Sequence, residues 1–457
     1  MKTLFPFQEL GRDFLALRAN AILADDMGLG KTLQAIEAMK MLNIQRGVIL
    51  CPLGVRRTWL KTLRDQHPTA FLKEITSPGI VPEQNAINII NYDIVWREPL
   101  IKELKQLRFP VLICDESHFL KSIDAKRTKY VLGKGGIYNG CQRRWMMTGT
   151  PVLNRPIELY PVLRSICPEK LGDFQDYYKY AYKFCAAYQD TFGFNTSGAS
   201  NLKELANILA PFMLRRMKEE VLPDLPSITY EKIYLDPTAK IVSLSKQEKE
   251  DMAAAPSIRQ AIGLLKVKPA IVHIEELLAT KNKILVYTWH KAVYHALHDH
   301  FGKKSVLFTG EESIDAKEKA KEDFIKDPNI KVFIGQLDAV GVGTDGLQEV
   351  CDTCLFVELY DVPGKIKQAC DRLRRIGQDQ KVLAQFLVVE ESVDEDIVNH
   401  LVDKSKNINV ILKEGKEVCF VTTHCAVCRG QKEMKELKRV AGLSVCKDCR
   451  PKLECIA

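Results

Sequence analysis

Long apolar runs are missing from this 457-residue sequence. No stretch of about 18 consecutive apolar residues occurs, so we expect no membrane-spanning helix. The opening residues MKTLFPFQEL lack the apolar core of a secretory signal, because Pro6, Gln8 and Glu9 interrupt it. Internal repeats and low-complexity tracts are also absent, which argues against a repeat architecture. We therefore expect a soluble protein.

A strong charge of either sign is also lacking. The 66 Lys and Arg residues and 58 Asp and Glu residues leave a formal charge of +8, a mild excess that leans toward a polyanionic partner. Most of the 14 cysteines stand singly in apolar runs such as VILCP and VLICDE. Without a secretory signal, buried thiols in a reducing compartment explain these better than disulfides do. A cysteine cluster near the end is the exception.

Apolar runs of strand length alternate with helical patterns along the chain. This alternation predicts an α/β fold with mostly parallel sheets, and the length allows two or three domains. Open sheets of this class bind ligands at the carboxyl ends of their strands. The predicted strands are residues 21–24, 47–52, 87–92, 110–115 and 144–150 in the first half, and 283–289, 305–310, 331–337, 354–360 and 382–389 in the second.

The texture of the sequence changes between the two halves. A tyrosine-rich stretch, Tyr177–Tyr188, predicts a helix, and TFGFNTSGASN after it predicts a loop. The helix predicted in APFMLRRMKEEVLPDLPS is expected to end at its prolines. We divide the chain into a first lobe at 1–228 with a helical protrusion at 165–222, a connection at 229–257, a second lobe at 258–412 and a metal-binding tail at 413–457.

The segment ADDMGLGKT ends like a phosphate-binding loop but lacks its usual first glycine, whose place is taken by Asp25. In such a loop, backbone amides and a helix N-terminus face the anionic oxygens of a nucleotide. Lys31 would supply charge to the terminal phosphates, and the Thr32 hydroxyl can hold Mg²⁺. A chance turn between strand and helix is the alternative. The backbone expected to cradle ATP is that of Met27, Gly28, Leu29, Gly30, Lys31 and Thr32.

The segment VLICDESH places two adjacent carboxylates at the end of an apolar strand. Ionised carboxylates at a buried strand end need partners. Asp115 can hold Mg²⁺, and Glu116 can orient and deprotonate an attacking water. A solvated pair of acids is the alternative for one Asp-Glu alone, but the preceding Gly-Lys-Thr favours a nucleotide site.

Four motifs in order, DDMGLGKT, DESH, MTGTPVLNRPIELY and QACDRLRRIGQ, resemble the Swi/Snf-type branch of the superfamily 2 helicases. The loop of that branch usually reads Asp-Glu-Met-Gly-Leu-Gly-Lys-Thr, so the resemblance makes an acid at Asp25 a family trait. GTPVLNRPIELY and DESHFLKS are most similar to the annealing-helicase (HARP-like) subgroup. The resemblance covers roughly residues 4 to 400. It implies two RecA-like lobes facing a shared cleft.

The resemblance also implies roles for individual positions. Gln8 corresponds to a glutamine that reads the adenine edge, and residues 51–63 and 90–95 correspond to segments that track the DNA backbone. Thr148, Gly149 and Thr150 correspond to a motif that couples nucleotide state to lobe movement. Gly341 and Gly343 lie in a loop similar to one that touches DNA and nucleotide. Asp345 beside them departs from the usual neutral residue, and an acid facing phosphate would weaken DNA contact there.

Gln368, Arg372 and Arg375 occur in KQACDRLRRIGQ at a spacing that places the two arginines on one helical face. A guanidinium delivered from the second lobe stabilises the charge of the transition state only when the lobes close. A basic solvent-facing helix is the alternative, although it leaves the glutamines unexplained. Arg374 and Asp361 stand where the family commonly has histidine and tryptophan.

The tail carries a Cys-x2-Cys-x17-Cys-x2-Cys pattern. Two close pairs at this separation predict a structural Zn²⁺ site in a small zinc ribbon. Buried free thiols or a ribbon that has lost its metal are the alternatives, and His424 is a ligand, a nuclease base or a bystander. Eight Lys or Arg against three acids between Arg429 and Lys452 suit DNA phosphate or a protein partner. The proposed ligands are Cys425, Cys428, Cys446 and Cys449.

These observations predict a DNA-dependent ATPase that moves along double-stranded DNA. ATP and Mg²⁺ would bind lobe one, and the catalytic residues would be Lys31, Asp115, Glu116, Arg372 and Arg375, with Gln8, Gly343 and Gln368 contributing to nucleotide binding. We expect a monomeric motor, cytoplasmic or nucleoid-associated, or nuclear in a eukaryote, that holds DNA by its phosphates. A strand-separating DNA or RNA helicase, a nuclease using the tail, and a scaffold with a silent ATPase are the alternatives.

Overall fold

The computed structural model describes residues 3–191, 193–250, 255–340, 344 and 346–412, and the backbone of four short strands in the last 45 residues. Those strands are β16 (Thr423–His424), β17 (Gln431–Lys432), β18 (Leu437–Val440) and β19 (Leu443–Cys446). Residues 3–223 and 406–412 form one compact unit, called unit 1, and 224–405 form a second, called unit 2. Among the described residues, no helix has the length and apolar character needed to cross a membrane.

Unit 1 is built on a seven-stranded sheet in the order β3-β4-β2-β5-β6-β1-β9. Every neighbouring pair in it is parallel. The central strands are continuous apolar runs, as expected where helices cover both faces of a parallel sheet. The strands are β1 (Asn20–Leu23), β2 (Gly47–Cys51), β3 (Leu72–Ile75), β4 (Ile87–Asn91), β5 (Phe109–Asp115), β6 (Cys141–Met147) and β9 (Met213–Leu214).

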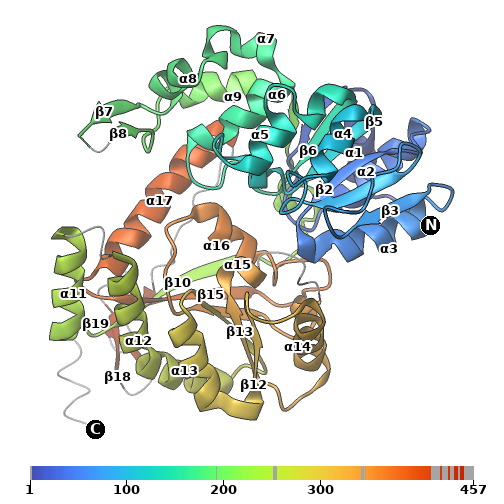
Figure 1. The fold of residues 1–457 in the computed structure, drawn as a ribbon. Helices are drawn as coiled ribbons and strands as arrows, with labels where there is room; N and C mark the ends of the chain where they lie inside the picture. The colour runs from blue at the N-terminus through green and yellow to red at the C-terminus, as the bar shows by residue number, and fades with distance from the viewer. Residues whose placement is uncertain are drawn as a thin grey trace. The chain divides into compact units, whose positions relative to one another are not determined.

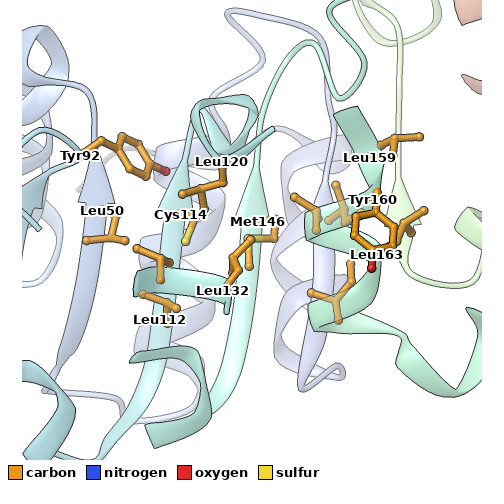
Figure 2. Close-up of a cluster of buried hydrophobic side chains, with 14 of the residues drawn as sticks. Leu50, Tyr92, Leu112, Cys114, Leu120, Leu132, Met146, Leu159, Tyr160 and Leu163 are labelled. Atoms are coloured by element: carbon orange, nitrogen blue, oxygen red, sulfur yellow. The ribbon is translucent and has the colours of Figure 1, made fainter. Parts of the chain in front are cut away.

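Alternate side chains of these strands enter two separate cores, because successive residues of a strand face opposite sides of the sheet. On one face, Ile49 and Trp145 pack with α1 (Pro6–Ala16), α2 (Lys31–Met41) and α3 (Arg56–Gln66). On the other, Leu50, Leu112 and Met146 pack with α4 (Leu100–Gln106), α5 (Lys126–Leu132) and α6 (Tyr160–Ile166) (Figure 2). The three layers hold the carboxyl ends of the strands at one edge.

The protrusion of unit 1 follows α6 and is drawn in green in Figure 1. Its helices are α7 (Pro168–Leu171), α8 (Tyr177–Phe184) and α9 (Leu202–Leu209). The predicted helix is therefore shorter than expected, and the predicted loop contains a hairpin of β7 (Tyr188–Asp190) and β8 (Gly193–Asn195). Phe194 packs against the rings of Tyr178 and Tyr182, which gives the hairpin an anchor on α8.

Unit 2 contains a six-stranded, fully parallel sheet in the order β10-β15-β14-β11-β13-β12. Ile284 and Val286 face the core shared with α12 and α13, whereas Leu285 and Tyr287 face the core shared with α14 and α16. The strands are β10 (Ile228–Leu235), β11 (Ile284–Thr288), β12 (Ser305–Phe308), β13 (Val332–Gln336), β14 (Thr353–Phe356) and β15 (Val382–Val389). The helices are α11 (Ala239–Glu250), α12 (Ala255–Leu278), α13 (Lys291–Phe301), α14 (Ile314–Lys326), α15 (Leu337–Val340), α16 (Pro363–Cys370) and α17 (Val393–Leu412). The last part of α17, residues 406–412, belongs to unit 1.

The structure draws the domain boundary differently from the sequence. The segment expected to be a connection includes β10, which pairs with β15 along its whole length and so belongs to unit 2. Its mixed pattern ITYEKIYL reflects an edge strand that is only partly buried. The helix expected before the prolines is only the short α10 (Lys218–Val221), because the preceding Met213–Leu214 pairs with β1 as a strand. Both the α/β class and the parallel sheets are as predicted.

Candidate nucleotide site

The phosphate-binding loop joins β1 to α2 at the carboxyl edge of the unit 1 sheet. Gly28 and Gly30 have φ angles of 85° and 77°, in the left-handed region that favours glycine. Gly30 is the residue that precedes the first turn of α2. The helix N-terminus therefore follows the loop directly, as an anion site requires.

Lys31 is the first residue of α2 and is almost fully buried. Its Nζ donates to the backbone carbonyls of Asp25 and Asp26, at 2.8 and 3.2 Å. These contacts hold the ammonium group inside the loop, where its charge faces the space enclosed by the backbone. Thr32 follows in the first turn of the same helix.

Gln8 lies directly against the loop. Its Nε2 donates to the carbonyl of Leu29 at 3.1 Å, and its Oε1 accepts from the backbone N–H of Phe5 at 3.1 Å. A Cβ on Gly30 would lie 2.4 Å from Gln8 Nε2, so only glycine leaves room for this packing. The structure thus brings Gln8 to the loop, while its contact with adenine remains a prediction.

Asp25, which replaces the usual first glycine, is completely buried and paired. Arg216 donates from Nε to Asp25 Oδ1 at 2.9 Å and from Nη2 to Oδ2. Gln34 of α2 donates to the same carboxylate at 3.1 Å and to the Leu29 carbonyl at 3.0 Å. A buried charge pair of this kind is retained only with such partners. The Asp25 carboxylate therefore links the loop to Arg216, which follows β9 in the chain.

The sequence did not reveal Arg216 and Gln34 as site residues. Arg216 also donates to the carbonyl of Phe7, next to Gln8, so one guanidinium joins the loop, α1 and β9. Its neighbour Arg215 donates to the carbonyls of Ala24 and Gly149, at 2.7 and 3.2 Å. A buried carboxylate at Asp25 requires a cationic partner, so a partner could have been expected from the sequence. The sequence does not indicate which arginine that partner is.

Asp115 ends β5 and is held by two donors. Trp59 Nε1 donates to its Oδ2 at 2.7 Å, and the backbone N–H of Glu116 donates to its Oδ1 at 3.0 Å. Burial raises the pKa of Asp115 to about 6, with Glu116 adding to the rise and the Trp59 hydrogen bond opposing it. Trp59 was not recognised from the sequence, because it lies on α3, 56 residues earlier in the chain.

Glu116 has φ 49° and ψ 52°, a left-handed conformation that is uncommon for a residue with a side chain. Strain of this kind often marks a functional position. Thr148 Oγ1 lies 3.4 Å from Glu116 Oε2, and His118 Nδ1 lies 3.3 Å from the same oxygen. The backbone N–H of Thr150 donates to Thr148 Oγ1 at 3.1 Å. The acid is therefore linked to the Thr148–Thr150 motif.

Gly149 brings this motif against the phosphate loop. A Cβ added to it would lie 2.4 Å from Met27 Cγ and 3.4 Å from Lys31 Nζ. Three segments predicted from separate motifs therefore meet at one edge of unit 1: the loop with Lys31, the Asp115–Glu116 pair, and Thr148–Thr150. This gathering places a lysine ammonium group near two carboxylates, which are residue types that sites for a Mg²⁺-bound nucleotide use.

The raised pKa of Asp115 leads to a pH-dependent prediction for the nucleotide-free protein. The folded-state pKa of about 6 exceeds the ordinary 3.8, so the stability this group contributes is full below pH 4 and is lost as pH rises through 6. Asp115→Asn removes that loss and should raise the unfolding temperature at pH 7.5 by roughly 3–8 °C, with less effect at pH 4.5. Thermal unfolding at both pH values measures this. An unfolding temperature that Asp115→Asn raises equally at both pH values would contradict the prediction.

The second-lobe residues lie in unit 2 at the end of α16. Gln368 is in that helix, but α16 ends at Cys370, so Arg372 and Arg375 follow it in a turn rather than sharing a helical face. Arg372 is 3% exposed, which excludes a solvent-facing role for it. Arg375 Nε donates to the Asp371 carbonyl at 3.1 Å. The expected helix stops at Cys370, and the chain then turns. Gly377, in this turn, has a φ of 97°, which lies in the left-handed region.

Gln378, the last residue of the QACDRLRRIGQ motif, has a structural role. Its Nε2 donates to the carbonyls of Cys351 and Gln348, at 2.9 and 3.1 Å. Cys351 and Cys354, which are closely spaced in the chain, are both buried, and burial raises the pKa of Cys351 to about 12. Both observations agree with a structural role.

Several predicted site residues lie outside the described residues. They are Gly341, Gly343, Asp345, Cys425, Cys428 and Cys449, whereas Cys446 ends β19 and only its backbone is described. Within the described part of the chain, no group of three or more His, Cys, Asp or Glu side chains is arranged to hold a metal ion.

Comparison with known proteins gives the class of this site. The model of the SNF2-related domain matches residues 14–286, more than half of the chain. The chain therefore belongs to the SNF2-related family. The predicted Swi/Snf-type membership is confirmed.

Individual relatives agree with this membership. The DNA annealing helicase and endonuclease ZRANB3 of Mus musculus is 32% identical over 86% of this chain and 39% of its own length. The SWI/SNF-related matrix-associated actin-dependent regulator of chromatin subfamily A-like protein 1 of Xenopus laevis is 30% identical over 88% of this chain and 43% of its own. The chain thus spans about two fifths of these relatives.

A solved structure is also similar. The Sulfolobus solfataricus SWI2/SNF2 ATPase core in complex with dsDNA shares 23% identity, with a TM-score of 0.43 over 91% of this chain and 94% of that one.

Proposed function

We propose that this protein is an ATP-dependent translocase on double-stranded DNA. The observation that carries the proposal is the meeting of Lys31, Asp115, Glu116 and the Thr148–Thr150 motif at one edge of unit 1. A strand-separating helicase and a scaffold are the alternatives. Membership of the SNF2-related family and the segments at 51–63 and 90–95, which by resemblance track the DNA backbone, favour movement on a duplex.

In this proposal the loop binds ATP through the backbone of residues 27–32 and the Lys31 ammonium. Thr32 and Asp115 would hold Mg²⁺, which neutralises charge on the phosphates when it is bound. The donor set fits: a hydroxyl in the first turn of α2, and a carboxylate fixed by Trp59. A cation bound nearby would favour the charged form of Asp115 and so oppose the rise in its pKa that burial causes.

Glu116 is the proposed base for the attacking water. Its strained backbone and its contacts to Thr148 and His118 hold the carboxylate in one place. Because Thr148 also bonds the N–H of Thr150, a change at the nucleotide can reach this motif and move it. Arg372 and Arg375 are proposed to complete the site from unit 2, so that hydrolysis depends on closure.

DNA would be held mainly through its phosphates, so binding should tolerate changes in sequence and weaken with salt. ZRANB3 is named for DNA annealing and endonuclease activity, and the structure from Sulfolobus solfataricus holds dsDNA. We propose the same ligand class here. Both units belong to one chain, so the motor is proposed to act as a monomer, in the nucleoid or nucleus where its DNA lies.

An ATPase panel tests the function. Duplex DNA, single-stranded DNA and RNA are compared as stimulators, with DNA cleavage and strand separation followed in parallel and Lys31→Ala as the inactive control. Stimulation greatest with duplex DNA supports the proposal. Stimulation greatest with RNA or strand separation would favour a helicase, and cleavage that survives Lys31→Ala would favour a nuclease.

We also propose that the tail is a zinc ribbon held by Cys425, Cys428, Cys446 and Cys449. Its support is the ligand spacing, since these side chains lie outside the described residues. Such a module could bind DNA or a protein partner. Purified protein should contain about one zinc per chain, measured by mass spectrometry of the metal.

The control for zinc binding changes Cys351, which belongs to another closely spaced pair of cysteines, Cys351 and Cys354. Cys425→Ser with Cys428→Ser should abolish zinc, whereas Cys351→Ser should leave it unchanged, because that thiol is buried and bonds the carbonyl of Lys283 at 3.3 Å. Wild-type protein without zinc after purification free of chelators would contradict the site.

A further inference from the structure

A hollow with a basic lining lies in unit 1, at the opposite end of the sheet from the nucleotide site. It has a volume of about 720 Å³ and is lined by residues 42–46, 108–110 and 139–143. These segments precede β2, β5 and β6 or begin them, so the hollow lies at the amino ends of three neighbouring strands. We call it the amino-end hollow.

The amino-end hollow is remote from the nucleotide site. Phe109, the first residue of β5, lines the hollow, and Asp115, the last, belongs to the nucleotide site. Seven strand residues at about 3.3 Å each separate the two by roughly 20 Å. A ligand in the hollow therefore cannot be the ATP of the loop.

The charge of the hollow is of one sign. Arg46, Arg108 and Arg143 line it, and none of its lining residues is Asp or Glu. Arg143 Nη1 donates to the carbonyls of Ala16 and Arg18, at 3.0 and 3.1 Å. Because these acceptors carry no charge, they do not offset the positive charge of the guanidinium.

Arg108 and Arg46 are similarly uncompensated. Arg108 Nη1 donates only to backbone carbonyls, those of Lys105 and Leu107 at 3.1 Å each, and its side chain is exposed. Across the described ranges, none of the three arginines forms an ion pair with an acid. A guanidinium has five N–H donors, so most of those in the hollow remain available to an incoming acceptor.

The remaining polar side chains add neutral donors. Asn43, Gln45, Asn139 and Gln142 line the hollow, and all of them except Gln45 are exposed. Apolar residues line it as well: Leu42, Ile44, Phe109 and Pro110, of which Ile44 and Phe109 are buried.

We propose that the amino-end hollow binds backbone phosphates of a nucleic-acid segment other than the duplex of the translocase proposed above. Arginine forks and amide donors without an acid among them match phosphodiesters, which arginine binds with paired hydrogen bonds. An acidic peptide would also meet the charge, and its competition with DNA is therefore measured below. A protein with two such sites holds two arms of a branched DNA, or two duplexes, at once.

The experiment measures DNA binding without nucleotide, so its result does not depend on the ATPase proposal. Arg46→Ala with Arg108→Ala is the test variant, since both side chains can be removed without disturbing the carbonyl contacts of Arg143. Affinity for a three-arm junction and for a short linear duplex is measured by fluorescence anisotropy over a range of salt. Lys170→Ala with Lys203→Ala, two exposed cations elsewhere in unit 1, is the matched control.

The double arginine variant should bind the junction at least about tenfold more weakly, with its salt slope reduced by about 2, because each lost phosphate contact reduces the slope by about 0.9. The short duplex and the unfolding temperature should be nearly unaffected. Arg46→Lys with Arg108→Lys should recover most of the slope, since lysine also pairs with phosphate.

Two competitors distinguish the source of the anion. Junction binding should resist inorganic triphosphate and poly-glutamate at concentrations where excess DNA displaces it. Junction binding unchanged in the arginine variant, an equal loss in the lysine control, or a hollow that takes only inorganic phosphate or only the acidic peptide would each overturn the proposal.

Discussion

Glu116→Gln should lower the turnover number for ATP by about 10²- to 10⁴-fold while ATP binding stays nearly unchanged. The amide keeps the size of the carboxylate and can still accept from Thr148, but it cannot take the proton of the attacking water. The strained backbone at φ 49° should persist, because β5 and the turn after it impose it. Single-turnover hydrolysis and a fluorescent-nucleotide binding assay measure the two effects separately.

Glu103→Gln on α4 is a matched control for this prediction and should retain turnover within about twofold. The control lies in a helix of the opposite core, on the face of the sheet away from α2. Robust residual ATP hydrolysis by Glu116→Gln in the presence of duplex DNA would contradict the role of Glu116 as the general base. A parallel loss of binding would instead indicate that the acid is needed to build the site.

Arg375→Ala should reduce DNA-stimulated turnover by about 10³- to 10⁵-fold, with the affinity for ATP changed much less. A guanidinium that reaches the phosphates only on closure stabilises the transition state and leaves ground-state binding alone. Arg372→Ala should have a similar effect on turnover, but it also removes a side chain that is 3% exposed, so its folding must be checked. Steady-state ATPase assays with saturating duplex DNA test both.

Arg374→Gln provides the control for the arginine pair. Arg374 lies between them, and its Nε donates to the carbonyl of Pro226 at 2.9 Å within unit 2. The substitution should lower the unfolding temperature yet keep turnover within a fewfold of wild type. If Arg375→Ala retained turnover, or if Arg374→Gln lost it equally, hydrolysis would not depend on a guanidinium from this turn.

The strands whose prediction succeeded are those with a strong local pattern. All ten expected strands occur, because each is an apolar run that both faces of a covered parallel sheet demand. Within the two large parallel sheets, the strands that were missed are β3, β9 and β10, with sequences LKEI, ML and ITYEKIYL. All three are edge strands and β9 is also very short, so their identity comes from the neighbour they pair with rather than from their own residues.

The turn after α16 shows the same limit at the second arginine motif. The spacing of Arg372 and Arg375 is compatible with a helix, yet the helix ends at Cys370. Gln378, through its bonds to the Gln348 and Cys351 carbonyls, holds the chain in a turn instead. These acceptors lie about thirty residues away, so no local pattern announces them.

The sequence by itself predicted the class of this protein and the segments proposed to carry the nucleotide chemistry. The glycines of the loop lie next to Lys31 in the chain, and Asp115 and Glu116 are adjacent to each other, so short-range backbone geometry places each of these two sets at a strand end. Only the tertiary structure decided how the site is held. Arg216 reaches Asp25 across 191 residues, because β9 pairs with β1 in the sheet, and Trp59 reaches Asp115 across 56, because α3 packs on the face of that sheet. Which cation neutralises a buried acid depends on distance in space, and distance in space follows from the packed fold rather than from the order of residues.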